Sequence, residues 1–349
     1  MKTDREKLLA RLSLLKPAIK SGGIIPELAH IWFKDQDVFA FDGELGIRAA
    51  LDTGLECGVL GGVLLALLGT SKLPEASLDL DDSGASLVVK MGKSSSRMAM
   101  LDIERGVWPF PERAGKDKDA VEITDGLLAA LKRVLVVEPK HLTRVEHKGI
   151  MVSCGKKGSA LCTTDSATIA LAYADCSLGA GDGTALLPRA FAEQVAGSCS
   201  AGDKMALRDD HLVANGKDAA IFSKIVDAAD VQDVRVIIEE TAKKHPESVS
   251  IPHELSIALE RATILDGRDE AVVALEIDGG VLRATGAYKH GELSEQISIK
   301  GGKHPKAAGQ FTAGLVMRGL AGAKTMSLVE RALLLRGAAG DLYAVAPRR

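Results

Sequence analysis

The stretch Gly322-Ala-Lys-Thr-Met-Ser-Leu-Val-Glu-Arg-Ala-Leu-Leu-Leu-Arg-Gly337 indicates the architecture, because its outline occurs at two earlier places in the chain. It consists of two short runs with apolar and polar residues in alternation, joined by a turn, which is typical of a β-hairpin. Residues 69–92 and 197–216 have the same outline, and each of the three segments opens with small residues that end a helix. The chain therefore reads as a threefold repeat.

The segments upstream of each hairpin extend the repeat. Short helical stretches precede the hairpins at residues 57–68, 187–196 and 311–320. Further upstream, amphipathic helices are predicted at 5–19, 125–136 and 252–264, followed by strand-rich runs at 31–49, 149–173 and 271–299. In the first helix, Leu8, Leu12, Leu15 and Ile19 recur at helical spacing on one face. The unit is thus helix, strands, helix, strands, three times over, at roughly 115–120 residues a copy.

This pattern predicts an α+β fold of three repeated domains, each with two helices on antiparallel sheet. Polar, charged or Pro-rich stretches at residues 108–119 and 239–247 are plausible linkers between the copies. We therefore predict domains at residues 1–118, 119–243 and 244–349.

Composition limits the classes of function. Hydrophobic residues make up 46% and charged residues 26%, which is ordinary for a globular protein and excludes a disordered one. Aromatic residues are only 3%, so the cores must be aliphatic and binding by base stacking is disfavoured. The net charge of −3 argues against a uniformly basic coat but leaves room for a local basic surface.

The cysteines and the apolar runs predict the compartment. The five cysteines are odd in number and show no C-x-x-C spacing, so reduced thiols in a cytoplasmic protein fit best. The start of the chain, MKTDREKLL, is charged, and the longest apolar run, residues 59–68, is too short to span a bilayer. We expect a cytoplasmic protein with no membrane partner.

No residue pattern points to a catalytic centre. The eight histidines are scattered without metal-ligand spacing. Asp79, Asp81 and Asp82 lead into a Ser-Gly turn, which favours a solvated edge over a divalent-cation cluster. Residues 179–183 are rich in glycine and fit a connector better than a phosphate-binding loop, and G-x-S-x-G is absent. We predict no cofactor, no metal and no enzymatic activity.

The cations on the predicted helices are more suggestive. Each one alone fits a solvated helix face. If the helices of all copies line one side of a curved array, however, the cations share one surface and contact duplex DNA independently of its base sequence. The candidate DNA-facing residues are Lys20, Arg133, Lys140, Arg144, Lys148 and Arg189.

Ordered motifs in the second and third copies resemble one family along the whole chain: the bacterial-type sliding clamp, the beta subunit of the replicative DNA polymerase. Residues 160–170, ALCTTDSATIA, resemble its A-T-D-G-H-R-L-A strand, and residues 187–193, LPRAFAE, its V-P-R-K helix start. Residues 221–228 and 233–236 resemble F-x-S-K-L-V-D-G and D-Y-R-R-V, residues 258–265 resemble A-F-A-R-A-A-I-L, and the ending LYAVAPRR resembles Y-V-V-M-P-M-R-L. The absence of a readable first strand and a divergent cleft suggest a phage-type or otherwise distant member.

The resemblance implies a head-to-tail homodimer that forms a ring around double-stranded DNA, with a clamp loader and the replicative DNA polymerase as partners. At the subunit junction it places Ile264 and Leu265 against Met98 and Met100, although an intradomain core remains the alternative for the first pair. It also implies a cleft between the second and third domains that binds short peptides. The matching cleft residues are Thr164, Ser166, Ala167, Thr168, Ile169, Arg235, Val236, Thr312, Leu315, Val345, Ala346, Pro347 and Arg348.

Several cleft positions depart from the family pattern. The His-Arg pair is Ala167-Thr168, and the tail methionines are Ala346 and Arg348. Methionine lines promiscuous grooves, so its loss suggests a narrower or altered set of partners. We expect a processivity factor without chemistry of its own. The alternatives are a clamp-like scaffold that is not loaded on DNA and an α+β enzyme with a site at a domain junction.

Overall fold

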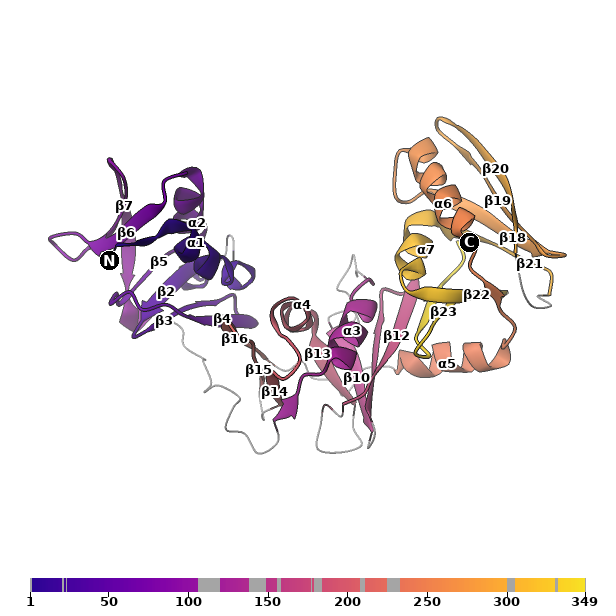
Figure 1. The fold of residues 1–349 in the computed structure, drawn as a ribbon, viewed down its shortest axis with the longest axis horizontal. Coiled ribbons are helices and arrows are strands. Elements are labelled where there is room, and N and C mark those ends of the chain that lie inside the picture. The colour runs from indigo at the N-terminus through magenta and orange to yellow at the C-terminus, as the bar shows by residue number, and fades with distance from the viewer. Residues whose placement is uncertain are drawn as a thin grey trace. The chain divides into compact units, whose positions relative to one another are not determined.

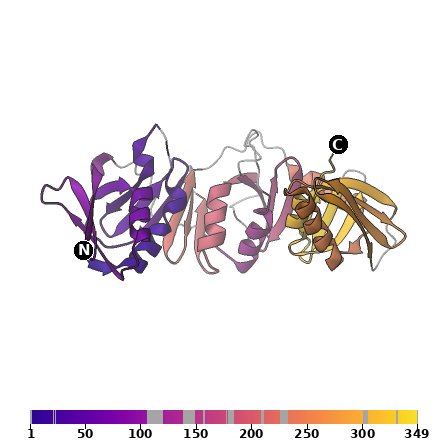
Figure 2. The same ribbon diagram turned by 90° about the horizontal axis from the view of Figure 1, so that it is seen from above.

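A computed structural model describes residues 2–20, 22, 24–105, 120–137, 149–155, 158–176, 178, 184–207, 211–224, 233–299, 305–329 and 332–348 (Figures 1 and 2). Contacts divide the chain into two compact units. Unit 1 comprises residues 1–125 and 193–225, and unit 2 comprises residues 126–192 and 226–349. No helix among the described residues has the length and apolar character needed to cross a membrane.

The described chain passes three times through one order of elements: a short strand, a helix, four strands, a second helix and three strands. The first copy contains β1 (Lys2–Asp4), α1 (Arg5–Ser13), β2 (His30–Lys34), β3 (Asp37–Phe41), β4 (Leu45–Ala50), β5 (Cys57–Leu60), α2 (Gly61–Thr70), β6 (Glu75–Leu80), β7 (Ser86–Met91) and β8 (Ser94–Asp102). The second contains β9 (Val121–Glu122), α3 (Asp125–Val134), β10 (Gly149–Gly155), β11 (Gly158–Thr164), β12 (Thr168–Ala174), β13 (Thr184–Pro188), α4 (Arg189–Ser198), β14 (Lys204–Leu207), β15 (His211–Asn215) and β16 (Ala219–Lys224).

A linking helix, α5 (Val234–Lys244), precedes the third copy. That copy contains β17 (Val249–Ser250), α6 (His253–Asp266), β18 (Val272–Asp278), β19 (Val281–Tyr288), β20 (Gly291–Ser298), β21 (Ala307–Thr312), α7 (Ala313–Leu320), β22 (Ala323–Val329), β23 (Ala332–Gly337) and β24 (Leu342–Val345). The predicted α+β class with a repeated two-helix unit is confirmed. The predicted domain boundaries stay a prediction, and the proposed linker at 108–119 lies outside the described residues.

Several predicted bounds differ from those in the structure. The helix predicted from residue 57 begins at Gly61, because residues 57–60 form β5 and pair with β2. The first helix ends at Ser13 instead of residue 19, and Pro17 lies in a following 3-10 turn. Proline lacks the N–H that would continue the helical ladder, which explains the early end. The polar stretch at 239–247 is mostly helical, as the C-terminal part of α5.

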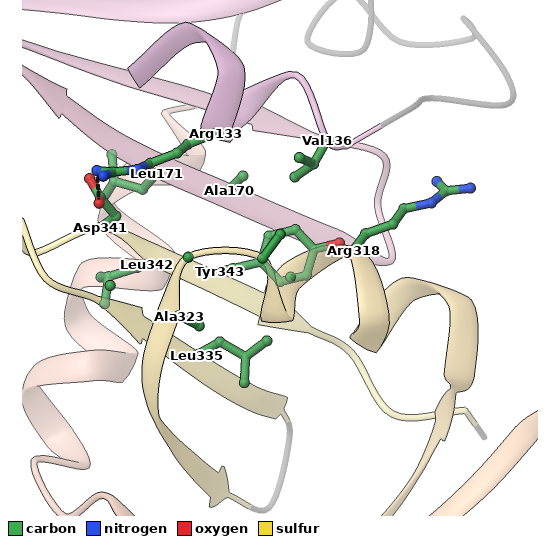
Figure 3. Close-up of a pocket in the computed structure, with 14 residues that line it drawn as sticks. Arg133, Val136, Ala170, Leu171, Arg318, Ala323, Leu335, Asp341, Leu342 and Tyr343 are labelled. Carbon is green, nitrogen blue, oxygen red and sulfur yellow. Dashed lines mark hydrogen bonds and ion pairs between the residues drawn. The ribbon is translucent and has the colours of Figure 1, made fainter. Parts of the chain in front are cut away.

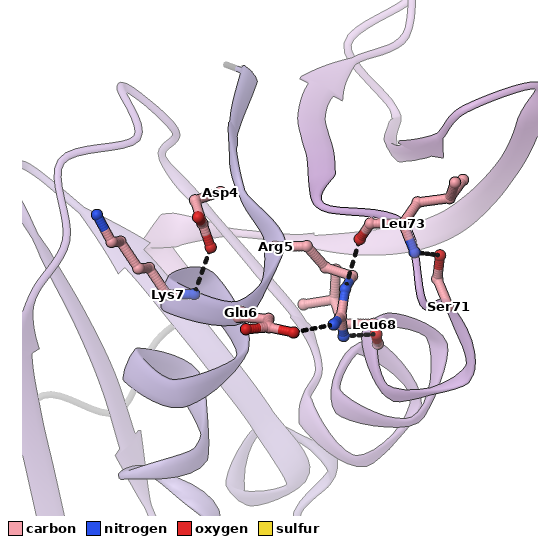
Figure 4. Close-up of polar contacts among 7 residues, drawn as sticks. All are labelled: Asp4, Arg5, Glu6, Lys7, Leu68, Ser71 and Leu73. Carbon is pink, nitrogen blue, oxygen red and sulfur yellow. Dashed lines mark hydrogen bonds and ion pairs between the residues drawn. The ribbon is translucent and has the colours of Figure 1, made fainter.

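The first strand, which the sequence appeared to lack, is present as β1 and pairs with β6. It is only three residues long and polar, so it carries no alternating apolar signal. Arg5 follows it directly and is buried (Figure 4). Its Nε donates to the carbonyl of Leu73 at 2.8 Å and its Nη1 to the carbonyl of Leu68 at 3.1 Å. These bonds tie the start of α1 to the end of α2, where helix carbonyls lack intrahelical donors.

The strands form long antiparallel sheets within each unit. In unit 1, twelve strands follow the order β1-β6-β7-β8-β5-β2-β3-β4-β16-β15-β14-β9. In unit 2, eight strands follow the order β13-β10-β11-β12-β24-β23-β22-β17, and four follow the order β20-β19-β18-β21. Two of these neighbours join different copies of the repeat: β4 pairs with β16, and β12 pairs with β24.

The eight-stranded sheet of unit 2 carries helices on both faces. On one face, Val234 and Ile238 of α5 join a buried cluster with Leu171 and Leu334. On the other face, Tyr343 lies so close to Gly319 of α7 that a Cβ there would be 2.1 Å from its ring. Successive residues of a strand point to opposite faces, so α5 and α7 lie on opposite sides of β24.

Candidate functional site

The pairing of β12 with β24 brings together two of the segments predicted for the peptide cleft. Thr168 lies opposite Val345, and Leu171 lies opposite Leu342. Beyond the paired strands, the N–H of Ala346 donates to the carbonyl of Ala167 at 2.8 Å. Residues that are about 180 positions apart in sequence therefore form one surface of unit 2.

The turn before β12 is held by one carboxylate. Oδ1 of Asp165 accepts hydrogen bonds from the N–H groups of Ala167 at 2.9 Å and Thr168 at 2.6 Å, and from the Thr168 hydroxyl at 2.8 Å. Ser166 adopts φ +71°, a left-handed conformation that favours glycine. This explains why the matching family motif has glycine there, and it leaves Ser166 and Ala167 exposed at the tip of the turn.

Helix α5 borders the same surface. Asp233 caps it by accepting the N–H of Arg235 at 3.0 Å, and Tyr173 of β12 donates to Glu239 at 2.9 Å. Val236 and Ile237 point away from the core and are 43% and 47% exposed. Such exposed branched side chains on a helix that already buries one apolar face are suited to a partner.

Arg235 offers a donor on this surface. Its Nη2 lies 3.3 Å from Asp233 Oδ2, while its buried Nε has no hydrogen-bond partner among the described residues. A buried donor without an acceptor is unfavourable, and a partner's carbonyl oxygen would satisfy it.

The chain ending lies along the third copy. The N–H of Arg348 donates to the carbonyl of Gln310 at 2.7 Å, and its Nε donates to Oγ1 of Thr312 at 3.2 Å. Leu315 is half-buried on α7, and its carbonyl accepts from the hydroxyl of Tyr343 at 3.1 Å. The tail is thus fixed beside the start of α7.

The predicted cleft residues divide into two groups. Those on the surface are Ser166, Ala167, Val236, Ala346 and Arg348, with Ile169, Arg235, Leu315 and Pro347 half-buried. The side chains of Thr164, Thr168, Thr312 and Val345 are buried, so they shape the site from beneath. Sequence matching missed Ile237, although an isoleucine off the buried stripe of an amphipathic helix was a readable signal.

A cavity opens at the same strand junction on the face that carries α7 (Figure 3). Arg133 of α3 forms an ion pair with Oδ2 of Asp341, and the ring of Tyr343 and the backbone of Gly319 line the cavity beside it. The other carboxylate oxygen of Asp341, Oδ1, is buried and has no hydrogen-bond partner among the described residues. Arg318 of α7 also lines the cavity.

The candidate DNA-facing residues differ in their exposure and in their contacts within the chain. Lys20 is exposed after the first helix, and Arg133 forms an ion pair with Asp341. The guanidinium of Arg189 donates to the carbonyls of Leu135 and Val137, which directly follow α3. A cation at a helix C-terminus is stabilising, so Arg189 stabilises the C-terminal end of α3. Lys140, Arg144 and Lys148 lie outside the described residues.

Two strands have a side without a partner among the described residues. Residues 94–99 of β8 pair only with β7, and β20 pairs only with β19. Beside β20, Ile264 at the end of α6 is 73% exposed, whereas Leu265 packs beneath Gly291. Met98 on β8 is buried and Met100 half-buried. Of the four residues predicted for the subunit junction, Ile264 offers the most apolar surface.

The described residues contain no group of three or more His, Cys, Asp or Glu arranged to hold a metal ion. Asp81, one of the acids singled out in the sequence, uses Oδ1 to accept the N–H of Ala85 at 2.9 Å within the β6–β7 turn. Hydrogen bonds from Ser83 and from that turn lower the pKa of its carboxyl. Turn formation accounts for this acid.

No protein-family profile and no curated protein matches the chain by sequence. Solved structures do resemble it over its full length. A putative DNA polymerase III beta subunit from Eubacterium rectale has a TM-score of 0.83 at 15% identity, covering 100% of this chain and 99% of that one. A DNA polymerase sliding clamp from Pseudomonas aeruginosa gives 0.81 at 18%, covering 100% and 99%. The DNA polymerase III beta subunit of Thermotoga maritima gives 0.81 at 18%, covering 100% and 98%. This chain has the fold of these proteins.

Proposed function

We propose that the chain is a DNA polymerase processivity factor. Two copies form a closed ring around duplex DNA, a clamp loader places the ring there, and a peptide cleft tethers the polymerase and other partners. The chain performs no chemistry, because it acts by encircling DNA and holding the polymerase there. The observation that supports this most directly is how the copies of the repeat join.

The two intrachain junctions follow one rule. In both, the fourth strand of one repeat pairs antiparallel with the last strand of the next, as β4 with β16 and β12 with β24. Among the described residues, the fourth strand of the third repeat, β20, has no such neighbour from another repeat, and neither has β8, the last strand of the first repeat. Pairing β20 of one copy with β8 of another repeats the rule and covers both edges.

The hydrogen-bond registers predict how these edges meet. Gly46 pairs with Phe222, and Ile169 pairs with Ala344. Counted from the hairpin turns, Glu292 on β20 has the position of Gly46 and Ile169, and Arg97 on β8 has the position of Phe222 and Ala344. The same pairing therefore places Glu292 opposite Arg97 of the partner copy. Both side chains are exposed and opposite in charge. Opposite charges on directly paired strand residues are stabilising.

The cleft is proposed on the α5 side of the β12–β24 junction. Val236 and Ile237 offer apolar contact, Nε of Arg235 offers a donor, and Arg348 offers a positive charge. We propose an extended peptide with apolar side chains and an acidic flank as the ligand. The absence of methionine from this surface supports a narrow choice of partner.

Contact with DNA is proposed for the cations Lys20, Arg133, Arg189, Lys140, Arg144 and Lys148. A net charge of −3 suits weak contact, because a closed ring stays on DNA by topology and needs no tight groove binding. Such contact depends on salt and not on base sequence.

A covalently closed ring tests the function. Arg97→Cys with Glu292→Cys places two thiols at directly paired positions, where Cα separations of about 4.5–5.5 Å permit a disulfide. Burial raises the pKa of the native Cys57 thiol to about 11 and those of Cys162 and Cys199 to about 12, so these thiols compete little. Cys154 and Cys176 are half-exposed and are replaced by serine.

The double-cysteine protein is mixed with nicked circular plasmid and its clamp loader, oxidised and washed at high salt. We expect the oxidised ring to stay on circular DNA and to leave when a restriction enzyme linearises it. In light scattering the free protein should have twice the 36.7 kDa mass of the chain. A dimer that never stays on circles would instead identify a clamp-like scaffold. A monomer that binds circular and linear DNA equally would contradict the ring.

A further inference from the structure

Each intrachain junction carries an ion pair that spans two repeats. Nη1 of Arg11 on α1 donates to Oδ1 of Asp218 at 3.0 Å and to its carbonyl at 2.9 Å. Arg133 on α3 forms the corresponding pair with Asp341 (Figure 3). In both, the arginine lies on the first helix of one repeat and the aspartate lies immediately before the last strand of the next.

The Arg133–Asp341 pair is costly to separate. Asp341 is 7% exposed, and one of its oxygens already lacks a hydrogen-bond partner among the described residues. Removing Arg133 from such a carboxylate leaves a buried charge uncompensated. The pair therefore resists opening of the β12–β24 junction.

In the third repeat, the matching arginine pairs with a glutamate of its own repeat instead of an aspartate of the next. Arg261 is the ninth residue of α6, as Arg133 is the ninth residue of α3. Its Nη1 donates at 2.6 Å to Oε1 of Glu295, which lies on β20 of the same repeat. At the two intrachain junctions the matching strand positions are Ala49 and Ala172, neither of which can accept a side-chain hydrogen bond.

Strand β8 has no acidic residue at the positions that match Asp218 and Asp341. Ala220 pairs with Asn215, Leu342 with Arg336, and Ser95 of β8 with Lys90. Each of these pairs lies one step beyond the pair that closes its hairpin turn, so the three residues correspond. Asp218 lies two residues before Ala220, and Asp341 lies one residue before Leu342. At these places β8 has Lys93 and Ser94.

From these observations we infer that the junction between two copies lacks the arginine–aspartate pair that holds both intrachain junctions. Arg261 is neutralised by Glu295 of its own chain, so it makes no charged bond across the junction. Subunit exchange at the β20–β8 junction therefore proceeds without this charge-assisted contact, and supplying the contact slows it. This inference rests on the proposed two-copy ring.

Transplanting the pair tests the inference. Ser94→Asp with Glu295→Ala reproduces at the interchain junction the residue types of Asp341 and Ala172 beside an arginine. Two preparations carrying different fluorophores are mixed, and subunit exchange is followed by energy transfer. We expect exchange to slow by about tenfold relative to the native chain, since charge-assisted hydrogen bonds are among the stronger ones. The slowing should shrink as salt is raised.

Ser94→Asp alone is the matched control. There the new carboxylate meets Glu295, so exchange should be faster than in the native ring. Circular dichroism melting checks that each variant folds. If light scattering finds no dimer, both the proposed function and this inference fail. If the dimer forms but the double variant exchanges as fast as the native chain, the inference alone is wrong.

Discussion

Gly46 on β4 and Phe222 on β16 lie directly opposite each other, and the phenyl ring fills the space where a side chain at position 46 would begin. A Cβ built on Gly46 would lie 1.7 Å from Cε1 of Phe222. The ring also stacks on Phe41 at 5.5 Å between centroids, within a cluster that includes Leu28 and Val213. This apolar contact joins the first repeat to the second within unit 1.

Gly46→Ala should therefore destabilise unit 1. Phe222 must leave its rotamer to admit one methyl group, and overpacking of this kind costs about 1–3 kcal/mol. Chemical denaturation measures the loss. Gly62→Ala is the control, because a Cβ there meets nothing within 4 Å, and it should leave stability unchanged or slightly higher.

Arg5→Met should destabilise the first repeat by about 2–3 kcal/mol, because the carbonyls of Leu68 and Leu73 lose charged donors. Methionine keeps most of the buried volume, so the change reports mainly the hydrogen bonds. Lys7→Met on the exposed side of α1 serves as the reference. Equal melting temperatures for the two variants would contradict the assigned role of Arg5.

Charge reversal tests the predicted register between copies. Arg97→Glu or Glu292→Arg alone places like charges opposite each other and should weaken the dimer by about threefold to tenfold. The double reversal restores an opposite pair and should restore the dimerisation constant measured by analytical ultracentrifugation. Additive losses in the double variant would show that the two residues do not face each other.

Val236→Ser with Ile237→Ser should weaken binding of a fluorescent polymerase peptide with apolar side chains and an acidic flank by at least about tenfold, because burial of two branched side chains is lost. The dimer should be unaffected, since both residues lie on α5. Fluorescence anisotropy measures the affinity. Lys244→Ser, in the last turn of the same helix, is the control.

Tyr343 predicts a specific alkaline transition. Burial raises the pKa of its hydroxyl from 10 to about 12. Because the folded pKa is the higher one, the folded state holds this proton more tightly, and the associated stability is present below pH 10 and is lost as the pH rises toward 12. Denaturation of Tyr343→Phe between pH 9 and 12 should show a shallower fall in stability than the native chain. Parallel curves would show that Tyr343 does not contribute.

The sequence indicated the repeated elements with some fidelity because hydrophobic periodicity reports a local property. Six helices were expected near their observed positions, and the strand-rich runs contain the observed strands. The errors fell where local signals are weak. β1 is three polar residues stabilised only by pairing with β6, and α5 was hidden in a charged stretch that resembled a linker.

The candidate peptide site was predictable as a set of segments, not as a set of accessible side chains. Motif matching brought residues 164–169 and 345–348 to one cleft, and the β12–β24 register brings them together. Yet Thr168 and Val345 are buried beneath that surface, and the exposed Ile237 was not named. Which face of a strand meets solvent depends on what packs against it, and that is a nonlocal property.

By itself the sequence determined the threefold alternation of helices and strands and the aliphatic character of the cores. These follow from residue spacing and composition, which act over a few positions of the chain. Only the tertiary structure decided that Arg133 reaches Asp341 and that Arg261 turns instead to Glu295. Such ion pairs depend on strand registers between residues far apart in sequence. Among the described residues, the same registers leave β20 and residues 94–99 of β8 with a strand partner on one side only, which no local pattern encodes.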